Sequence, residues 1–217
     1  MDYLNTDITT DYLNSSEFHE DRMLAYRFLA FMYKTAPNAA FIDSLLAMDS
    51  QTKTPLDSCI ETMKSLDPEQ LRIDLAAEYN RVFLSMGPDP VAPYESVYTS
   101  PHRLLMQEAR DEVLALYRAE ALKPSDETRI PEDHISIEFE YMAYLCGEAA
   151  QAFTDKNPER AEDYINKQKA FLQEHLLIWV LKMCDDMEKR VHTEFYKSLC
   201  AMTKEQLESD RDWLSEV

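Results

Sequence analysis

The sequence predicts an all-α fold: a single-domain multi-helix bundle with an ordered loop and a hinge between helices. Only 2 glycines occur among the 217 residues, whereas β-rich folds need glycine for their tight turns. Apolar residues recur at helical spacing, as in Leu71, Leu75 and Tyr79. Both stretches without this periodicity are short, so we expect one domain over residues 1–217.

Helix starts are marked by a capping side chain followed by proline, which fits the first helical position. This pattern occurs at Thr54–Pro55, Asp67–Pro68, Ser100–Pro101 and Asn157–Pro158. Asp67 and Thr203 also have glutamine three residues later, as in a capping box. Helices are predicted over Glu17–Thr35, Ala39–Met48, Pro55–Leu66, Pro68–Phe83, Pro101–Glu120, Ile135–Phe153, Pro158–Glu174, His175–Lys189, Val191–Met202 and Lys204–Leu214.

Two breaks interrupt this helical pattern. Ser85–Ser100 combines glycine and several prolines with the run Tyr94 to Tyr98, and we predict an ordered loop there. Lys123–Ile130 is polar and leads into Pro131–His134, which we predict to be a hinge before the next helix.

Composition excludes several classes of function. The chain has 22 basic and 41 acidic residues, a net charge of −19, which is the wrong sign for a nucleic-acid-binding protein. The charge favours a cationic partner, or it simply keeps the protein soluble, which is the plainer interpretation. Neither a Walker nor a Rossmann glycine motif is present, so we expect no cofactor.

The sequence contains no pattern typical of a catalytic or metal site. None of the 5 histidines has a glutamate three residues before it, and no G-x-S-x-G motif occurs. The 4 cysteines lie far apart in apolar stretches and are predicted to be buried free thiols. Met1–Ser16 lacks the features of a leader, and the apolar run Leu176–Leu181 is too short to span a bilayer, so we expect a cytoplasmic protein.

The loop and the hinge are the candidate binding elements. Tyr94 and Tyr98 are placed to flank a groove, with Glu95 offering a carboxylate to a guanidinium. The alternative is that these tyrosines only anchor the loop to the core. At the hinge, the plainer interpretation is that Asp133 caps the following helix and that His134 is solvated.

Together these segments resemble a known family. Glu78–Phe83, the Gly87–Pro88 loop, Pro93–Tyr98 and Pro131–His134 match, in order and spacing, the motifs of the TorD/DmsD family of redox-enzyme maturation chaperones. The resemblance covers Leu75 to Leu145. Three positions depart from the family pattern: Ile130 replaces a glutamate, Ala121 replaces a glycine, and Val82 takes a leucine position.

The resemblance implies an all-helical chaperone without catalytic activity. Its partner would be the twin-arginine signal peptide, or another segment, of an apo-molybdopterin oxidoreductase, and the chain would be a monomer or a domain-swapped homodimer. Carried over residue by residue, the peptide-binding positions are Tyr79, Val82, Phe83, Pro131, Asp133 and His134, with Tyr94, Ser96 and Tyr98 as further members of the motif.

A signal peptide with two arginines followed by an apolar stretch needs carboxylates beside an aromatic trough. We expect Asp133 and Glu95, with Glu132 in reserve, to bind the arginines. Two alternatives remain: a nitrate-reductase-assembly type of chaperone that serves a cytoplasmic catalytic subunit, and a helical-bundle metalloenzyme.

Overall fold

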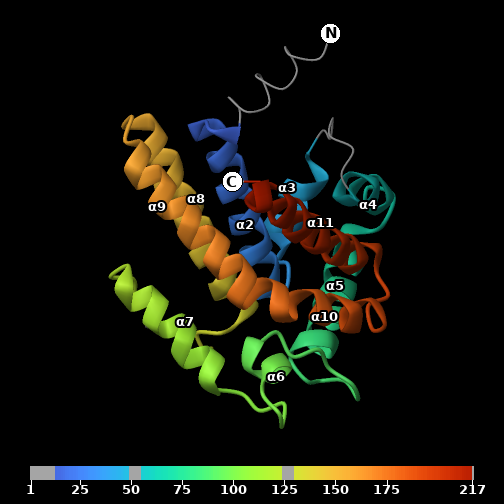
Figure 1. The fold of residues 1–217 in the computed structure, drawn as a ribbon. Helices are drawn as coiled ribbons and strands as arrows, with labels where there is room; N and C mark the ends of the chain where they lie inside the picture. Colours follow the sequence, from blue (N-terminus) through green and yellow to red (C-terminus); the bar gives the residue numbers. More distant parts are fainter. Residues whose placement is uncertain (1–12, 49–54, 124–129, 217) are drawn as a thin grey trace.

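Helices account for all regular secondary structure in the computed structural model, which describes residues 13–48, 55–123 and 130–216 (Figure 1). The predicted all-α class is therefore confirmed. Outside the helices, one isolated β-bridge joins Tyr94 and His134 within these ranges. The helices are α2 (Ser16–Lys34), α3 (Ala39–Leu46), α4 (Pro55–Met63), α5 (Pro68–Phe83), α6 (Glu95–Thr99), α7 (Glu108–Ala119), α8 (Ile135–Thr154), α9 (Pro158–Phe171), the π-helical turn η1 (Leu172–Leu176), α10 (Leu177–Glu188) and α11 (Glu194–Glu216).

Two of the predicted caps are formed. Asp67 Oδ1 accepts a hydrogen bond from the Gln70 amide at 2.8 Å, and Asn157 Oδ1 accepts one from the Arg160 amide at 3.1 Å. Each cap satisfies an amide that has no partner within its helix. Thr54, the capping residue predicted for α4, lies outside the described residues, as do most of Met1–Ser16 and of the polar break after Lys123.

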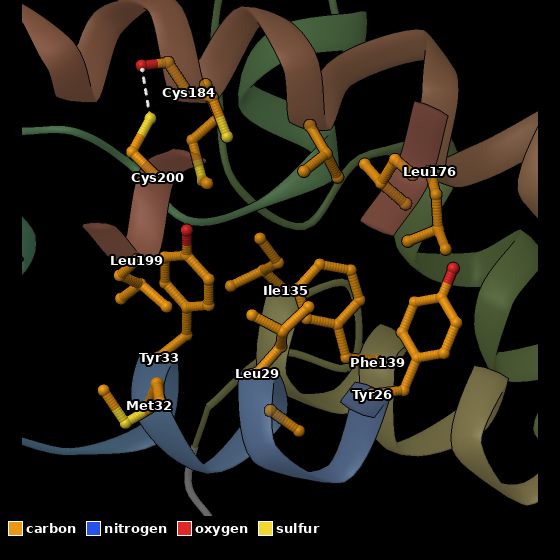
Figure 2. Packing of buried hydrophobic residues seen from close by; sticks show 14 of the residues in the cluster. Tyr26, Leu29, Met32, Tyr33, Ile135, Phe139, Leu176, Cys184, Leu199 and Cys200 are labelled. Atoms are coloured by element: carbon orange, nitrogen blue, oxygen red, sulfur yellow. Dashed lines mark hydrogen bonds between the residues drawn. The ribbon is translucent and has the colours of Figure 1, made fainter. Parts of the chain in front are cut away.

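The core lies where α2 packs along α8 and the C-terminal helices cover both (Figure 1). Figure 2 shows Leu29 and Tyr33 of α2 facing Ile135 and Phe139 of α8, with Leu176 of η1 on the side of this cluster away from α2. Removing such side chains from water is the main favourable contribution to folding. All 4 cysteines are buried free thiols, as predicted. No helix in the described part of the chain is long and apolar enough to cross a membrane.

A buried ion pair joins the first and last described helices. Arg22 of α2 contacts Asp210 of α11 through both Nε and Nη2, at 2.9 and 2.7 Å. Tyr26 donates to the same carboxylate at 2.7 Å, and Gln168 of α9 accepts from Arg22 Nη1. The bidentate geometry and the extra donor compensate for removing both charges from water.

The segment predicted as a loop, Ser85–Ser100, contains a short helix. Its last part forms α6, whose N-terminal amide at Ser96 donates to the Asp133 side chain at 2.9 Å. Local sequence did not reveal this cap because its acceptor lies 37 residues away along the chain.

The helix predicted from Pro101 begins later, at Glu108. Arg103 and Met106 have φ of 53° and 57°, values that no α-helical residue adopts. The Ser100 hydroxyl instead accepts a hydrogen bond from the Leu104 amide at 3.1 Å, which stabilises a turn. The Ser100–Pro101 pair therefore begins a turn rather than a helix.

The two helices predicted on either side of Thr203 form one continuous helix, α11. Thr203 is fully buried, and its hydroxyl donates to the Leu199 carbonyl at 2.8 Å, so it is satisfied inside the helix and caps nothing. The boundary predicted at His175 corresponds to η1, where the chain passes from α9 into α10 without leaving a helical path.

Candidate functional site

The predicted loop and hinge meet in the structure. Tyr94 and His134 form an antiparallel bridge, and their rings pack edge to face with centroids 5.0 Å apart. Two backbone hydrogen bonds extend the pairing: the Glu95 amide donates to the Asp133 carbonyl at 3.0 Å, and the Ile135 amide donates to the Pro93 carbonyl at 2.9 Å. We call residues 93–96 and 131–136 with these bonds the loop–hinge junction.

Asp133 and His134 are caps for two different helices. Asp133 is fully buried and caps α6 rather than α8, so the local interpretation of this residue is wrong. His134 caps α8 and is not solvated: its Nδ1 accepts from the Ser136 amide at 3.1 Å. Burial, with a smaller contribution from Lys34, lowers the pKa of His134 to about 4, so the imidazole is neutral and can act as an acceptor.

The three carboxylates expected to bind arginines already have partners within the chain. Glu95 is 1% exposed and contacts His175 Nδ1 at 3.0 Å. Asp133 accepts from the Ser96 amide, and Glu132, which is partly exposed, pairs with Arg110. In this conformation the first two carboxylates support the junction from inside.

The sequence analysis missed a fourth carboxylate, Glu138 of α8. It is fully buried, accepts a hydrogen bond from Trp179 Nε1 at 3.0 Å, and interacts with Glu95. Burial and the nearby negative charges of Glu95 and Asp133 raise its pKa well above the usual value of a carboxyl. A signal was present in the sequence, because Glu138 follows Ile135 and precedes Phe139 and Met142 on the apolar side of its helix.

Tyr79, Val82 and Phe83 lie in the core beneath the loop. The Tyr79 hydroxyl donates to the Tyr33 carbonyl at 3.0 Å, and burial raises the pKa of Tyr79 to about 12. The Val82 carbonyl accepts from the Val91 amide at 2.8 Å, which attaches the loop to α5. These side chains are almost completely buried, so they support the loop from below.

Three further predicted residues hold neighbouring segments in place: Ser96, Tyr98 and Pro131. The Ser96 hydroxyl accepts from the Gln107 amide at 3.1 Å, just before α7. The half-buried Tyr98 ring lies against the Trp179 ring, with centroids 5.6 Å apart, so this tyrosine holds the loop against α10. The Pro131 carbonyl accepts from the His134 amide at 3.1 Å and closes the turn of the hinge.

Two cavities lie along one face of α7, which is at the edge of the molecule (Figure 1): one is near the N-terminal end of this helix and the other near its C-terminal end. The α6–α7 pocket, of about 230 Å³, lies among α6, α7 and α10 and includes Glu95, Glu108, Glu112 and Ile178. The α7–α9 pocket, of about 160 Å³, includes Leu116, Tyr141, Lys167, Phe171 and His175. The Glu95–His175 pair joins the two, since each pocket is lined by one member.

The predicted residues are thus only partly gathered around an open cavity. Neither of these two pockets is lined by Tyr79, Phe83, Asp133 or His134. Glu95 is the one predicted residue that lines either of them. Two further glutamates of the α6–α7 pocket, Glu108 and Glu112, were not singled out from the sequence because single glutamates on a helix surface are common. No group of three or more His, Cys, Asp or Glu side chains in the described ranges is arranged to hold a metal ion.

Comparison with known proteins identifies relatives of the chain. The family model described as nitrate reductase delta subunit matches residues 46–185, more than half of the chain. A chaperone protein TorD from Photobacterium profundum is 28% identical over 154 residues, covering 70% of this chain and 69% of that protein. A TorD from Vibrio cholerae is 24% identical over 186 residues, covering 85% and 82%. A crystal structure of a proposed redox enzyme maturation protein from Archaeoglobus fulgidus covers 89% of this chain and 93% of that one, at 19% identity and a TM-score of 0.44.

These matches confirm the resemblance based on the loop and hinge motifs, which lie inside the matched range. The curated relatives are chaperones, so the prediction that the chain is not an enzyme is also confirmed, and the metalloenzyme alternative is dropped. The chain belongs to the nitrate reductase delta subunit family, as a TorD-type redox-enzyme maturation chaperone.

Proposed function

We propose that the chain is a cytoplasmic chaperone that binds the twin-arginine signal peptide, or the apo form, of a molybdopterin oxidoreductase until the cofactor is inserted and the enzyme is exported. The observation that carries this proposal is the loop–hinge junction. The two segments that carry the family motif are far apart in the sequence, yet Tyr94 and His134 pair directly. Binding residues are often carried by loops that a rigid scaffold positions, and this junction holds the loop against the helical core.

In this proposal the predicted residues have two roles, according to their exposure. Seven buried residues position the site: Tyr79, Val82, Phe83, Glu95, Ser96, Asp133 and His134. Four partly exposed residues are available for contact with the peptide: Tyr94, Tyr98, Pro131 and Glu132. The arrangement at Tyr98 supports this division, because the guanidinium of Arg103 already lies 5.2 Å from the centre of that ring. A tyrosine ring that contacts the guanidinium of Arg103 can also contact the guanidinium of an arginine in a bound peptide.

Titration calorimetry with a synthetic Arg-Arg leader peptide tests the proposal. The wild-type chain should bind this peptide and should bind a Gln-Gln version of it more weakly. Asp133→Ala combined with His134→Ala should weaken binding, because both residues fix the junction. Thermal unfolding and circular dichroism of the variant separate a lost site from a lost fold. No binding by the wild-type chain would refute the proposal. Unchanged affinity of the folded variant would show that the hinge does not contribute to the binding site.

A second candidate is a chaperone of the nitrate-reductase-assembly type, which holds a cytoplasmic catalytic subunit that has no leader. The description of the matching family model favours it. The two candidates differ in the segment that is held. Purification of the chain from its native cytoplasm, with mass spectrometry of the bound catalytic subunit, decides between them: an Arg-Arg leader on the subunit supports the first, and its absence supports the second. Light scattering of the same sample distinguishes a monomer from a domain-swapped homodimer.

A further inference from the structure

The α6–α7 pocket has an acidic lining. Glu95, Glu108 and Glu112 contribute carboxylates, and the lining contains no Lys, Arg or His. At about 230 Å³ the pocket is smaller than cavities that hold small-molecule ligands, which begin near 300 Å³. Its size suits a single long side chain, and its charge suits a cation.

The two carboxylates on α7 have no cation in contact with them. Glu108 and Glu112 are exposed, and neither forms an ion pair with any described residue. Other acidic residues of this region do have partners: Glu120 pairs with Lys167, and Asp111 pairs with Arg110. No cation of the described chain therefore offsets the negative charge of these two carboxylates, unlike that of their neighbours.

A third carboxylate, Glu95, forms the floor of the pocket. Glu95 is 1% exposed, and Glu138, whose carboxyl interacts with that of Glu95, is fully buried. Glu138 Oε1 has no hydrogen-bond partner in the described structure. His175 Nδ1 contacts Glu95 at 3.0 Å, on the side of the α7–α9 pocket. The carboxyl groups at and behind the floor therefore contact groups inside the chain, whereas the exposed Glu108 and Glu112 have no cation beside them.

An exposed apolar strip adjoins the pocket. Leu104, Leu105 and Met106 are 53%, 46% and 59% exposed, and they lie between Pro101 and Gln107, both of which line the pocket. Three consecutive apolar residues exposed to water mark a surface that a partner covers. The acidic pocket and the apolar strip together fit a segment in which a basic residue and apolar residues are neighbours.

We propose that the α6–α7 pocket and residues 104–106 form a two-part subsite, in which the pocket holds an arginine or lysine side chain of the partner and the strip holds the apolar residues next to it. This inference rests on the proposed function and names the part of the surface that receives the basic residue. The carboxylates of Glu108 and Glu112 bind the cation through charge-assisted hydrogen bonds, with the negative floor at Glu95 behind them.

A charge-neutral double variant tests the subsite. Glu108→Gln with Glu112→Gln keeps the shape of α7 and removes two charges, and the matched control is Glu205→Gln with Glu208→Gln on α11, which removes two exposed charges elsewhere. The probe is a synthetic peptide with two arginines followed by an apolar run, measured by calorimetry at two salt concentrations. Leu105→Ser tests the strip separately.

The pocket variant should bind the peptide about tenfold more weakly, with a smaller dependence on salt, and the control should bind like the wild type. Leu105→Ser should weaken binding of this peptide but not of one in which the apolar run is replaced by serines. If the pocket variant binds like the control, the subsite is refuted while the proposed function stands. If the wild-type chain does not bind the peptide at all, the proposed function fails and the subsite with it.

Discussion

Replacing Glu138 with glutamine should stabilise the protein, and by an amount that grows with pH. Glu138 is fully buried next to Glu95, and burial and negative neighbours raise its pKa well above the usual value. A glutamine has nearly the same shape. Its carbonyl oxygen can accept the hydrogen bond from Trp179, now 3.0 Å long, and its amide can donate to the Glu95 carboxylate.

The sign and size follow from proton linkage. In the unfolded chain Glu138 ionises near pH 4.3, whereas in the folded chain it keeps its proton to a higher pH. Between these two pKa values the folded state binds one more proton, so the free energy of unfolding of the wild type falls by about 1.4 kcal/mol for each pH unit gained. The loss is absent below the unfolded pKa and complete above the folded pKa. Glutamine does not titrate, so the variant lacks this contribution.

Urea denaturation at several values between about pH 4 and 8 measures the effect. The difference in unfolding free energy between Glu138→Gln and the wild type should rise over this range. Glu205→Gln on the exposed face of α11 should give a nearly constant difference. A Glu138→Gln variant that is destabilised by the same amount at every pH would refute the account of a buried, protonated carboxyl.

Four other predictions concern stability and reactivity. Asp133→Ala removes the acceptor of the Ser96 amide and should lower the free energy of unfolding by about 1–3 kcal/mol in urea titrations, with a smaller loss for Asp133→Asn. Arg22→Met should cost about 3–5 kcal/mol in thermal unfolding, because the buried Asp210 carboxylate would lose its cation. Ala121 has φ of 56°, so Ala121→Gly should raise Tm by the equivalent of up to about 1 kcal/mol, and a lower Tm would contradict the strain. The 4 buried thiols should be inert to an aromatic disulfide reagent in the native protein and should all react in denaturant; Cys146, with its pKa raised to about 12 by burial, is the clearest case.

Helices whose signals are local could be predicted from the sequence. The limits of α5 follow from the cap at Asp67 and the periodic apolar residues up to Phe83, and the structure agrees. Ala121 is a further case: the family pattern has glycine there, and the positive φ at the end of α7 explains why. Thr203 shows the limit of such reasoning, because a capping-box spacing occurs by chance inside a helix whose threonine finds another acceptor.

The candidate site was less accessible to sequence reasoning because its contacts are non-local. The cap of α6 comes from Asp133, and Glu95 meets His175 across 80 residues. The family motif indicated that the loop and the hinge act together, but it did not reveal which of their residues are buried. Which residues are buried depends on how α8 and α10 pack around the junction. The spacing of residues within one segment does not determine this packing.

The wide turn η1 has a consequence for insertions and deletions. Between Leu172 and Leu176 the chain holds one more residue per turn than an α-helix would, and α10 follows directly. Each residue in an α-helix advances the side-chain direction by about 100°. Deleting one residue from this turn would therefore leave an ordinary α-helical turn with Trp179 still facing the core, whereas inserting one more residue would rotate α10 by about 100° and carry Trp179 away from its hydrogen bond. The register of this one turn thus determines which face of the C-terminal half is turned inward.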